Sequence, residues 1–243
     1  MYDEATRTAA RRRLAEGWSI NQTSKQLGVS RAAIREWRDA EPGAGPTCPA
    51  PSRSTPAYAA LFGFYLGDGC ISRNQRAFSL RICCDATLPL VIDEVDDCLS
   101  SVHPERPIFH VRAPGVIVVQ SNWKHWPCLF PQHGPGRKHE RKLGMTDWQW
   151  AIVEDHPAAF LRGLFHSDGS RVNNWATKTV AGQKKRYDYP RWQFVNASEE
   201  ILGWCGDALD LINVPWRRSA RRTISVSTRA GVARLDELIG PKS

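Results

Sequence analysis

The sequence predicts an α+β protein in which two similar halves follow a small N-terminal helical unit. Residues 61–69 and 161–169, 100 positions apart, share one pattern, an apolar run that ends in Asp-Gly. Each is followed by segments of alternating apolar and polar residues, the pattern of a half-buried strand, and by helical segments in the same order. Residues 5–39 show only short helical patterns separated by turn residues. These observations predict the order αββαββα twice, after three short helices.

The N-terminal segment predicts three helices around one small core. The first spans 7–16 and ends at Gly17, the second follows Ser19 and runs to about Leu27, and the third follows Ser30 and includes Trp37. Ser is a favoured N-cap and Gly a favoured helix end, which fixes these boundaries. The core is expected to contain Leu14, Trp18, Ile20, Leu27, Val29, Ile34 and Trp37.

The run Leu27-Gly28-Val29-Ser30, with Ile34 and Trp37 after it, resembles the resolvase-type helix-turn-helix. The resemblance implies a DNA-binding domain over residues 1–40 whose third helix enters the major groove. Ser30, Arg31 and Arg35 would then contact DNA. A three-helix unit that binds protein is the alternative. Residues 41–56 are rich in Pro and predict a semi-extended linker.

The two repeated stretches predict a pair of closely packed helices. Small residues at their third and seventh positions lie one helical turn apart and let two backbones approach closely. These residues are Gly63 and Gly67 in the first stretch and Gly163 and Ser167 in the second. Asp68 and Asp168 would then meet at one end of the pair. Carboxylates at helix C-termini are unfavourable by about 0.3–1 kcal/mol each, and a divalent cation would reverse this.

The doubled motif, Gly67-Asp68-Gly69 and Ser167-Asp168-Gly169, resembles the single-chain LAGLIDADG family of homing endonucleases. Leu66 and His166 stand where that family usually has an acidic residue. The resemblance implies a first half at 57–132, a basic connector and helix at 133–156, and a second half at 157–243. It also implies antiparallel sheets that face DNA and one catalytic Asp for each strand cleaved.

The resemblance further implies the roles of individual residues. Asp68 and Asp168 would be both catalytic and metal-binding, with the backbone carbonyls of Gly67 and Ser167 as further ligands of two or three Mg²⁺ ions. Lys124 and Arg229, each after the fourth strand of its half, would be catalytic basic residues. The family's water-ordering Gln has no clear counterpart, although Asp85 and Asn196 lie near its place.

Alternating segments predict the individual strands and helices. In the first half these are a helix at 58–67, a strand at 78–84, a helix at 87–102, strands at 108–112 and 116–120, and a helix at 123–130. In the second half they are a helix at 158–167, strands at 171–178 and 191–196, a helix at 198–212, strands at 216–219 and 223–227, and a helix at 231–239. Polar residues on the open sheet faces are expected to contact DNA: Arg81, Arg191, Gln193, Arg221, Thr223 and Ser225. A solvated sheet face is the alternative.

The connector between the halves is rich in Gly and Pro and then basic. Arg137 and Lys138 are expected to contact phosphates. Cys128, His133 and His139 raise the alternative of a zinc site, although their spacing matches no metal motif. A plain surface connector is the third interpretation.

Composition favours a polyanionic partner. The net charge is +8 and the isoelectric point about 9.3, which suits nucleic acid. Residues 171–229 hold 11 basic and five acidic residues, whereas residues 71–129 hold six of each. The second half is therefore expected to make more phosphate contacts. Seven irregularly spaced cysteines argue against a disulfide framework, and no signal peptide or membrane span is evident, which predicts a cytoplasmic, nucleoid-associated protein of bacterial or phage origin.

The expected function is metal-dependent, site-specific cleavage of double-stranded DNA by a monomer with internal pseudo-twofold symmetry. One alternative is a regulator that binds specific DNA sequences on the same scaffold without cleaving them. An RNA-binding or splicing cofactor is another. The presence of an Asp at the end of both motif helices favours the nuclease, because a non-cleaving protein has no electrostatic reason to keep both.

Overall fold

A computed structural model describes residues 4–39, 55–75 and 77–242, which fall into two compact units, Met1–Pro49 and Ala50–Ser243. The predicted linker at 41–56 lies outside the described residues except for its last two. Thr55 caps the helix that follows and Pro56 is its first residue. No helix in these ranges is long and apolar enough to cross a membrane.

The first unit contains α1 (Glu4–Ala15), α2 (Ile20–Leu27) and α3 (Arg31–Asp39). The Ser19 side chain accepts a hydrogen bond from the Gln22 backbone, and the Gln22 side chain accepts one from the Ser19 backbone, which forms a capping box. Gly28 ends α2 with φ of 64°, a left-handed conformation that favours glycine. The Ser30 hydroxyl accepts from the Ala33 backbone and so caps α3. The three predicted helices and their caps are therefore present.

The core of this unit differs from the prediction at two positions, Ala10 and Trp18. Ala10, Val29, Ile34 and Trp37 are buried, but Trp18 is 38% exposed. Trp18 lies in the turn between α1 and α2, where the Arg13 guanidinium sits 5.8 Å from its ring. Because Trp18 lies in a turn, no helical periodicity indicates which way its side chain faces. Its burial was predicted from its apolar character alone, and that prediction is wrong.

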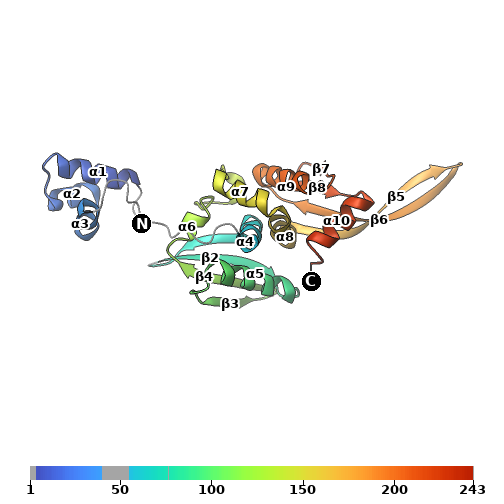
Figure 1. Cartoon of the computed structure of the whole chain (residues 1–243), viewed down its shortest axis with the longest axis horizontal. Coiled ribbons are helices and arrows are strands. Elements are labelled where there is room, and N and C mark those ends of the chain that lie inside the picture. The colour runs from blue at the N-terminus through green and yellow to red at the C-terminus, as the bar shows by residue number, and fades with distance from the viewer. Residues whose placement is uncertain (1–3, 40–54, 76, 243) are drawn as a thin grey trace. The chain divides into compact units, whose positions relative to one another are not determined.

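The second unit has the predicted order of elements in both halves (Figure 1). The first half comprises α4 (Pro56–Leu66), β1 (Gly69–Arg73), β2 (Phe78–Asp85), α5 (Pro89–Val102), β3 (Ile108–Ala113), β4 (Val116–Trp123) and α6 (Trp126–Leu129). A 3-10 turn at Lys138–Glu140 and α7 (Asp147–Asp155) follow. The second half comprises α8 (Pro157–Asp168), β5 (Gly169–Val180), β6 (Gln183–Val195), α9 (Glu199–Leu211), β7 (Arg217–Ala220), β8 (Thr223–Val226) and α10 (Arg229–Leu238).

Each half folds into one four-stranded antiparallel sheet, with strand orders β1-β2-β4-β3 and β5-β6-β8-β7. The matching orders confirm the α+β class and the internal repeat. Buried residues from both halves merge into a single core that includes Phe62, Phe160 and Trp192. The sheets are therefore held in one body by the helices between them.

Several predicted boundaries are wrong. The helix expected at 123–130 is only Trp126–Leu129, because β4 continues to Trp123, which pairs with Phe78. The strands expected at 171–178 and 191–196 are far longer, and β5 pairs with β6 from Gly169 to Val180. The added part of this hairpin is polar and solvent-exposed, so it lacks the apolar alternation from which the strands were predicted.

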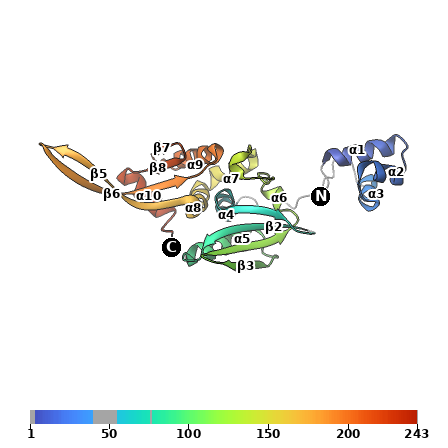
Figure 2. The same cartoon turned by 180° about the vertical axis from the view of Figure 1, so that it is seen from behind.

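Helices α4 and α8 lie side by side at the centre of this unit (Figures 1 and 2). A Cβ at Gly63 would stand 2.4 Å from the Phe160 carbonyl oxygen, and one at Gly163 would stand 2.1 Å from the Ala60 oxygen. Both are impossible contacts, so only glycine permits this backbone approach. The predicted close packing of the two motif helices is present.

Candidate functional site

The paired helices bring Asp68 and Asp168 to the same end of the helix pair. Asp68 follows the end of α4 at Gly67, and Asp168 is the last residue of α8. A Cβ at Gly67 would lie 2.0 Å from Ser167 Oγ and 3.3 Å from Asp168 Oδ2. The two predicted catalytic residues therefore belong to one site, which the glycine makes possible.

Crowding around the carboxylates raises their pKa values. Desolvation and the neighbouring Asp168 charge raise the pKa of Asp68 to about 6, although the Asp68 side chain keeps access to solvent. Desolvation also raises the pKa of Asp168, and a hydrogen bond from Asn196 opposes this effect. A site that disfavours its own negative charges attracts a cation.

Two lysines supply positive charge at this site. The Lys138 ammonium donates to the carbonyl oxygens of Leu66, Gly67 and Gly69 at 2.7, 2.8 and 2.9 Å, and also to that of Tyr65. Burial lowers the pKa of Lys138 to about 8, and the two nearby carboxylates oppose that shift. Lys138 is thus bound to the end of α4, whereas it was predicted to contact phosphate from a surface loop.

Lys242 occupies the matching position in the second half. Its ammonium donates to the Ser167 carbonyl at 2.6 Å and to the Gly169 carbonyl at 3.3 Å. Lys242 is not among the residues predicted from the sequence. A signal was available, because Lys138 and Lys242 each follow a Gly- and Pro-containing segment after the last helix of their half.

A cavity lies on each side of the paired helix ends. One, of 460 Å³, is lined by Gly67, Lys138, Asp168 and Asn196 among others. The other, of 320 Å³, is lined by residues that include Asp68, Ser167 and Lys242. Each cavity therefore combines one motif carboxylate, the residue that precedes the Asp of the other motif, and one lysine, and Asp85 also lines the second cavity. This is the arrangement expected of two pseudo-symmetric sites.

The two sites differ beside their carboxylates. Asn196 donates a 2.7 Å hydrogen bond to Asp168 Oδ2. Because Gly69 pairs with Ile82 and Gly169 pairs with Phe194, the position that matches Asn196 in the first half is Cys84. The Cys84 thiol is buried, and its burial together with the Asp68 charge raises its pKa to about 12. Asp168 thus has an amide partner where Asp68 has a neutral thiol.

Asp85, the other residue near the expected water-ordering position, uses its carboxylate locally. Its Oδ1 accepts from the backbone and the hydroxyl of Thr87 at 2.8 and 2.7 Å. The structure therefore brings Asn196, and not Asp85, into contact with a motif carboxylate.

Lys124 and Arg229 are not brought to the carboxylates. Lys124 is exposed and follows Trp123, which pairs with Phe78 at the end of the sheet opposite Gly69. Arg229 is exposed at the first turn of α10. The lysines whose charge reaches both carboxylates are instead Lys138 and Lys242.

The predicted DNA-contacting residues of the sheets fall into two groups. Arg81, Arg191 and Gln193 lie half-buried on the open faces, and the Nε atoms of both arginines have no hydrogen-bond partner within the described chain. Thr223 is half-buried at the edge of β8. Ser225 is covered, with 1% exposure and its Oγ 2.7 Å from Ser219 Oγ.

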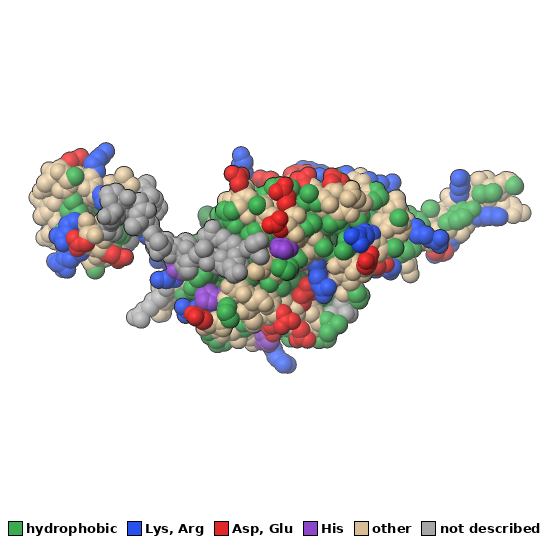
Figure 3. Space-filling model, viewed as in Figure 1, with side chains coloured by type: hydrophobic (Ala, Val, Ile, Leu, Met, Phe, Trp, Pro, Cys, Tyr) green, Lys and Arg blue, Asp and Glu red, His purple; other side chains and the backbone are tan. Residues whose placement is uncertain are grey.

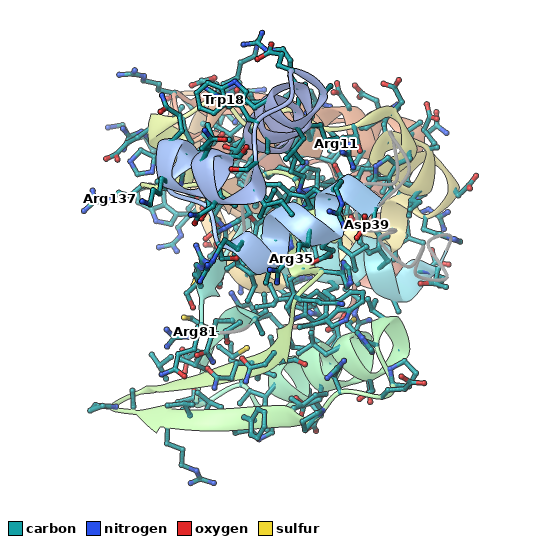
Figure 4. The ribbon with its side chains drawn as sticks, turned by 90° about the vertical axis from the view of Figure 1, so that its left-hand side faces the viewer. Arg11, Trp18, Arg35, Asp39, Arg81 and Arg137 are labelled. Atoms are coloured by element: carbon teal, nitrogen blue, oxygen red, sulfur yellow. The ribbon has the colours of Figure 1, made fainter. Side chains whose placement is uncertain are left out.

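The remaining predicted contacts lie in a turn, in the connector and in the first unit. Arg221 is exposed in the turn between β7 and β8, and Arg137 is exposed with its guanidinium 3.8 Å from Glu140. Ser30 and Arg31 are exposed at the start of α3, and Arg35 is exposed farther along it. Figure 4 shows Arg35 on α3 and Arg81 on the first sheet.

The donor atoms at the helix ends fit Mg²⁺. Magnesium prefers carboxylate, carbonyl and phosphate oxygens and retains several waters, so it needs only one or two protein carboxylates. Asp68, Asp168 and the carbonyls of Gly67 and Ser167 are such ligands. Across residues 4–39, 55–75 and 77–242, no three His, Cys, Asp or Glu side chains gather as a metal cluster, so the zinc alternative has no support there. Among the described cysteines, Cys70, Cys83, Cys84, Cys98 and Cys205 are free.

Comparison with solved structures finds similar chains that include homing endonucleases and a DUF199/WhiA protein. Neither a family model nor a curated protein matches the sequence. Mesophilic variants of the homing endonuclease I-DmoI give a TM-score of 0.48 at 11% identity, covering 78% of this chain and 98% of that chain. The LAGLIDADG meganuclease I-AabMI bound to uncleaved DNA gives 0.46 at 14% identity, covering 76% and 82%. Full-length DUF199/WhiA from Thermatoga maritima gives 0.48 at 16% identity, covering 79% of this chain and 58% of that chain. These values describe a likeness of shape and carry no conclusion about activity.

Proposed function

We propose that this chain is a site-specific DNA endonuclease that uses divalent metal and one Asp for each strand. The observation that supports this most is the meeting of Asp68 and Asp168 at the end of one closely packed helix pair, each in a cavity with its own lysine. Two desolvated carboxylates are costly to a protein that has no cation to bind. A metal-dependent hydrolase has a use for both.

Each residue at the helix ends has its own role in the proposed reaction. Asp68 and Asp168, with the carbonyls of Gly67 and Ser167, would hold Mg²⁺, which when bound supplies charge neutralisation at phosphorus and a more acidic water. Asn196 fixes the orientation of the Asp168 carboxylate through its 2.7 Å hydrogen bond. Lys138 and Lys242 add positive charge where a phosphodiester would approach. The proposal assigns this role to Lys138 and Lys242 in place of Lys124 and Arg229.

The proposed substrate is double-stranded DNA bound by a monomer. The open sheet faces with Arg81, Arg191 and Gln193 would contact the duplex, and the basic second half would provide most phosphate contacts. The predicted helix-turn-helix domain, residues 1–40, would add a DNA contact through Ser30, Arg31 and Arg35, connected by the Pro-rich segment 41–56. The two halves, 57–132 and 157–243, would each serve one strand.

The test begins with selection of duplexes from a randomised library by the full chain, in Ca²⁺ and in EDTA. The selected duplexes are cloned into supercoiled plasmid and incubated with Mg²⁺ and the wild type, Asp68→Asn, Asp168→Asn or the double variant. We expect linear product from the wild type, nicked circles from either single variant and no cleavage from the double variant. Selected duplexes that the wild type binds but never cuts would overturn the proposal.

A non-cleaving DNA-binding regulator is the second candidate, and one observation favours it. Lys138 and Lys242 already occupy the carbonyl oxygens that would serve as metal ligands, so lysine charge could stabilise the helix ends without metal. A regulator of this kind is predicted to cleave no duplex in Mg²⁺ and to bind DNA with the same affinity with and without Mg²⁺. Binding of selected duplexes by the Lys138→Met variant, with and without Mg²⁺, separates the two functions.

A further inference from the structure

The segment at 132–144, here called the connector loop, forms one wall of the larger cavity. Its residues from His133 to Arg141 line the 460 Å³ cavity that also contains Asp168. The structure describes the whole loop, and apart from the 3-10 turn at Lys138–Glu140 it contains neither helix nor strand. Its Gly and Pro residues favour no regular element either. The conformation of the connector loop is therefore fixed by contacts between its residues and the rest of the unit.

The buried Gln132 side chain closes the connector loop at its base. Its Nε2 donates to the carbonyl oxygen of Gly144, 12 positions along the chain, at 2.7 Å, and to Gln149 Oε1 at 2.7 Å. Gln149 Nε2 donates back to Gln132 Oε1 at 3.2 Å, so the two side-chain amides pair. The Arg141 guanidinium also donates to the Gln132 carbonyl. Lys138 lies at the middle of the loop that these contacts close.

Gln149 attaches the base of the loop to the helical core. It is fully buried on α7, and its Nε2 lies 3.0 Å from the Tyr58 hydroxyl on α4 and 3.2 Å from the Leu129 carbonyl at the end of α6. Buried amides are costly when they lose a partner, so this set of contacts favours one geometry of the loop. The helix α4 also supplies the carbonyls that Lys138 binds. One helix therefore anchors the base of the loop and receives the lysine at its middle.

Lys138 faces inward, unlike the basic residues on the surface. Figure 3 shows Lys and Arg side chains that project from this unit into solvent, and Figure 4 shows the neighbouring Arg137 pointing away from the ribbon. Lys138 is half-buried against the end of α4. Desolvation raises the pKa values of both motif carboxylates, and of the two lysines Lys138 opposes this more at Asp168 and Lys242 more at Asp68. Lys138 is therefore the lysine of the Asp168 site.

Lys242 reaches the Asp68 site by a different route. It follows Ile239, which is fully buried after α10, by three residues. Its ammonium donates to the carbonyls of Ser167 and Gly169. A short tether from a core residue positions Lys242, whereas a loop closed by side-chain amides positions Lys138. A change at the base of the connector loop should therefore affect one site and spare the other.

We propose that Gln132 is a positioning residue that holds Lys138 at the Asp168 site, through its hydrogen bonds to Gly144 and Gln149, and thereby supports cleavage of one DNA strand only. The strand assignment rests on the proposed cleavage of one strand by each Asp, whereas the placement of Lys138 does not. Gln132 acts through the loop and not on the phosphodiester itself. When Lys138 leaves the end of α4, the charge of the phosphodiester at the Asp168 site loses its nearest lysine.

The test compares Gln132→Met, which keeps the length of the side chain and removes its amide, with three other variants. Lys138→Met and Asp168→Asn mark the strand that depends on the Asp168 site. Leu99→Ala is the control for stability, because it removes a buried side chain from α5 and no hydrogen bond of the loop. Supercoiled plasmid that carries a selected duplex is incubated with Mg²⁺, and the rate at which each strand is cut is measured by primer extension. Calorimetry of each variant checks that it folds.

In this assay Gln132→Met should slow the cutting of the strand assigned to Asp168 by about tenfold, because a displaced charge stabilises the transition state poorly. Lys138→Met should slow the same strand by about 100-fold. Binding of the duplex in Ca²⁺ should change by less than about threefold in Gln132→Met, which places the effect on kcat and not on KM. Leu99→Ala should leave the ratio of the two rates unchanged, since a smaller folded fraction slows both cuts equally.

Limited digestion of the full chain with trypsin measures the placement of Lys138 without any DNA. Trypsin cuts after Lys138 only when the ammonium leaves the carbonyls of α4 and enters the protease, so the rate of this cut reports how often Lys138 is released. Fragment masses identify the cut. At a temperature well below every melting transition, the rate should rise about tenfold in Gln132→Met and change by less than about twofold in Leu99→Ala.

Equal slowing of both strands by Gln132→Met, or an unchanged rate of tryptic cutting after Lys138, would overturn the inference. A wild type that cuts no selected duplex would overturn the proposed function, and the strand assignment with it. In that case a faster tryptic cut in Gln132→Met would still support the placement of Lys138 by Gln132, and an unchanged cut would overturn this as well.

Discussion

Replacing Asp68 with Asn should make the second unit more stable at neutral pH. Crowding and the Asp168 charge raise the pKa of Asp68 to about 6 from the ordinary value of 3.8. For a fully shielded group this difference would correspond to about 3 kcal/mol of destabilisation. The Asp68 side chain is solvent-accessible, so screening reduces the expected gain in Asp68→Asn to about 1 kcal/mol. For a unit of this size that is about 2–4 °C in Tm.

Because the pKa of Asp68 is raised in the folded state, the stability gained by Asp68→Asn depends on pH. Between pH 3.8 and about 6 the folded state binds more protons at Asp68 than the unfolded state does, so wild-type stability falls as pH rises through this window. The advantage of Asp68→Asn should therefore be absent at about pH 3.5, grow between about pH 4 and 6, and stay constant above about pH 7.

The assay is differential scanning calorimetry of the full chain in EDTA, from about pH 3.5 to 8, which spans the titration of both carboxylates under study. Asp236→Asn is the control of opposite sign, because hydrogen bonds from Arg171 and Trp192 lower the pKa of Asp236. Losing that carboxylate should lower Tm at neutral pH. The reasoning is refuted if Asp68→Asn leaves Tm unchanged or lowers it at neutral pH, or if its effect on Tm does not depend on pH.

Three further predictions concern other parts of the chain. Gly163→Ala would place a Cβ 2.1 Å from a facing backbone oxygen and should lower the free energy of unfolding, measured in urea, by more than about 2 kcal/mol. The control Gly203→Ala in α9, with open space around it, should raise the free energy of unfolding by about 0.5–1 kcal/mol. Equal effects of the two substitutions would contradict the close helix packing. Because Asp168 has an amide partner and Asp68 does not, the wild type is expected to cut the two strands at unequal rates and to pass through a nicked circle; Cys84→Asn should reduce the accumulation of that nicked circle in a plasmid cleavage time course, and unchanged accumulation would show that this position does not set the difference. Ile34→Ala, in a core of few residues, should cost about 2–5 kcal/mol and melt the first unit alone; a shifted calorimetric transition of the second unit would count against their independence.

The local order of elements could be predicted from the sequence because each signal lies within a few residues. The Ser19 and Ser30 caps, the alternation in 78–84 and the repeated Asp-Gly stretches are local patterns, and the structure contains the elements they indicate. Gly63 and Gly163 even indicated which helices touch, because small residues spaced one turn apart on both helices leave room for two backbones to meet. Trp18 shows the limit of predicting burial from local patterns, because a residue in a turn has no helical periodicity that indicates whether its side chain faces the core.

The residues around the motif carboxylates needed the tertiary structure. Lys138 and Lys242 lie about 70 positions from the carbonyls that they contact, so no local pattern connects them. Cys84 and Asn196 can be matched only through strand register. The sequence by itself determined the repeated architecture and the pair of motif carboxylates. Only the folded chain decided which lysines, which amide and which cavity surround each carboxylate, because those contacts depend on how distant segments pack.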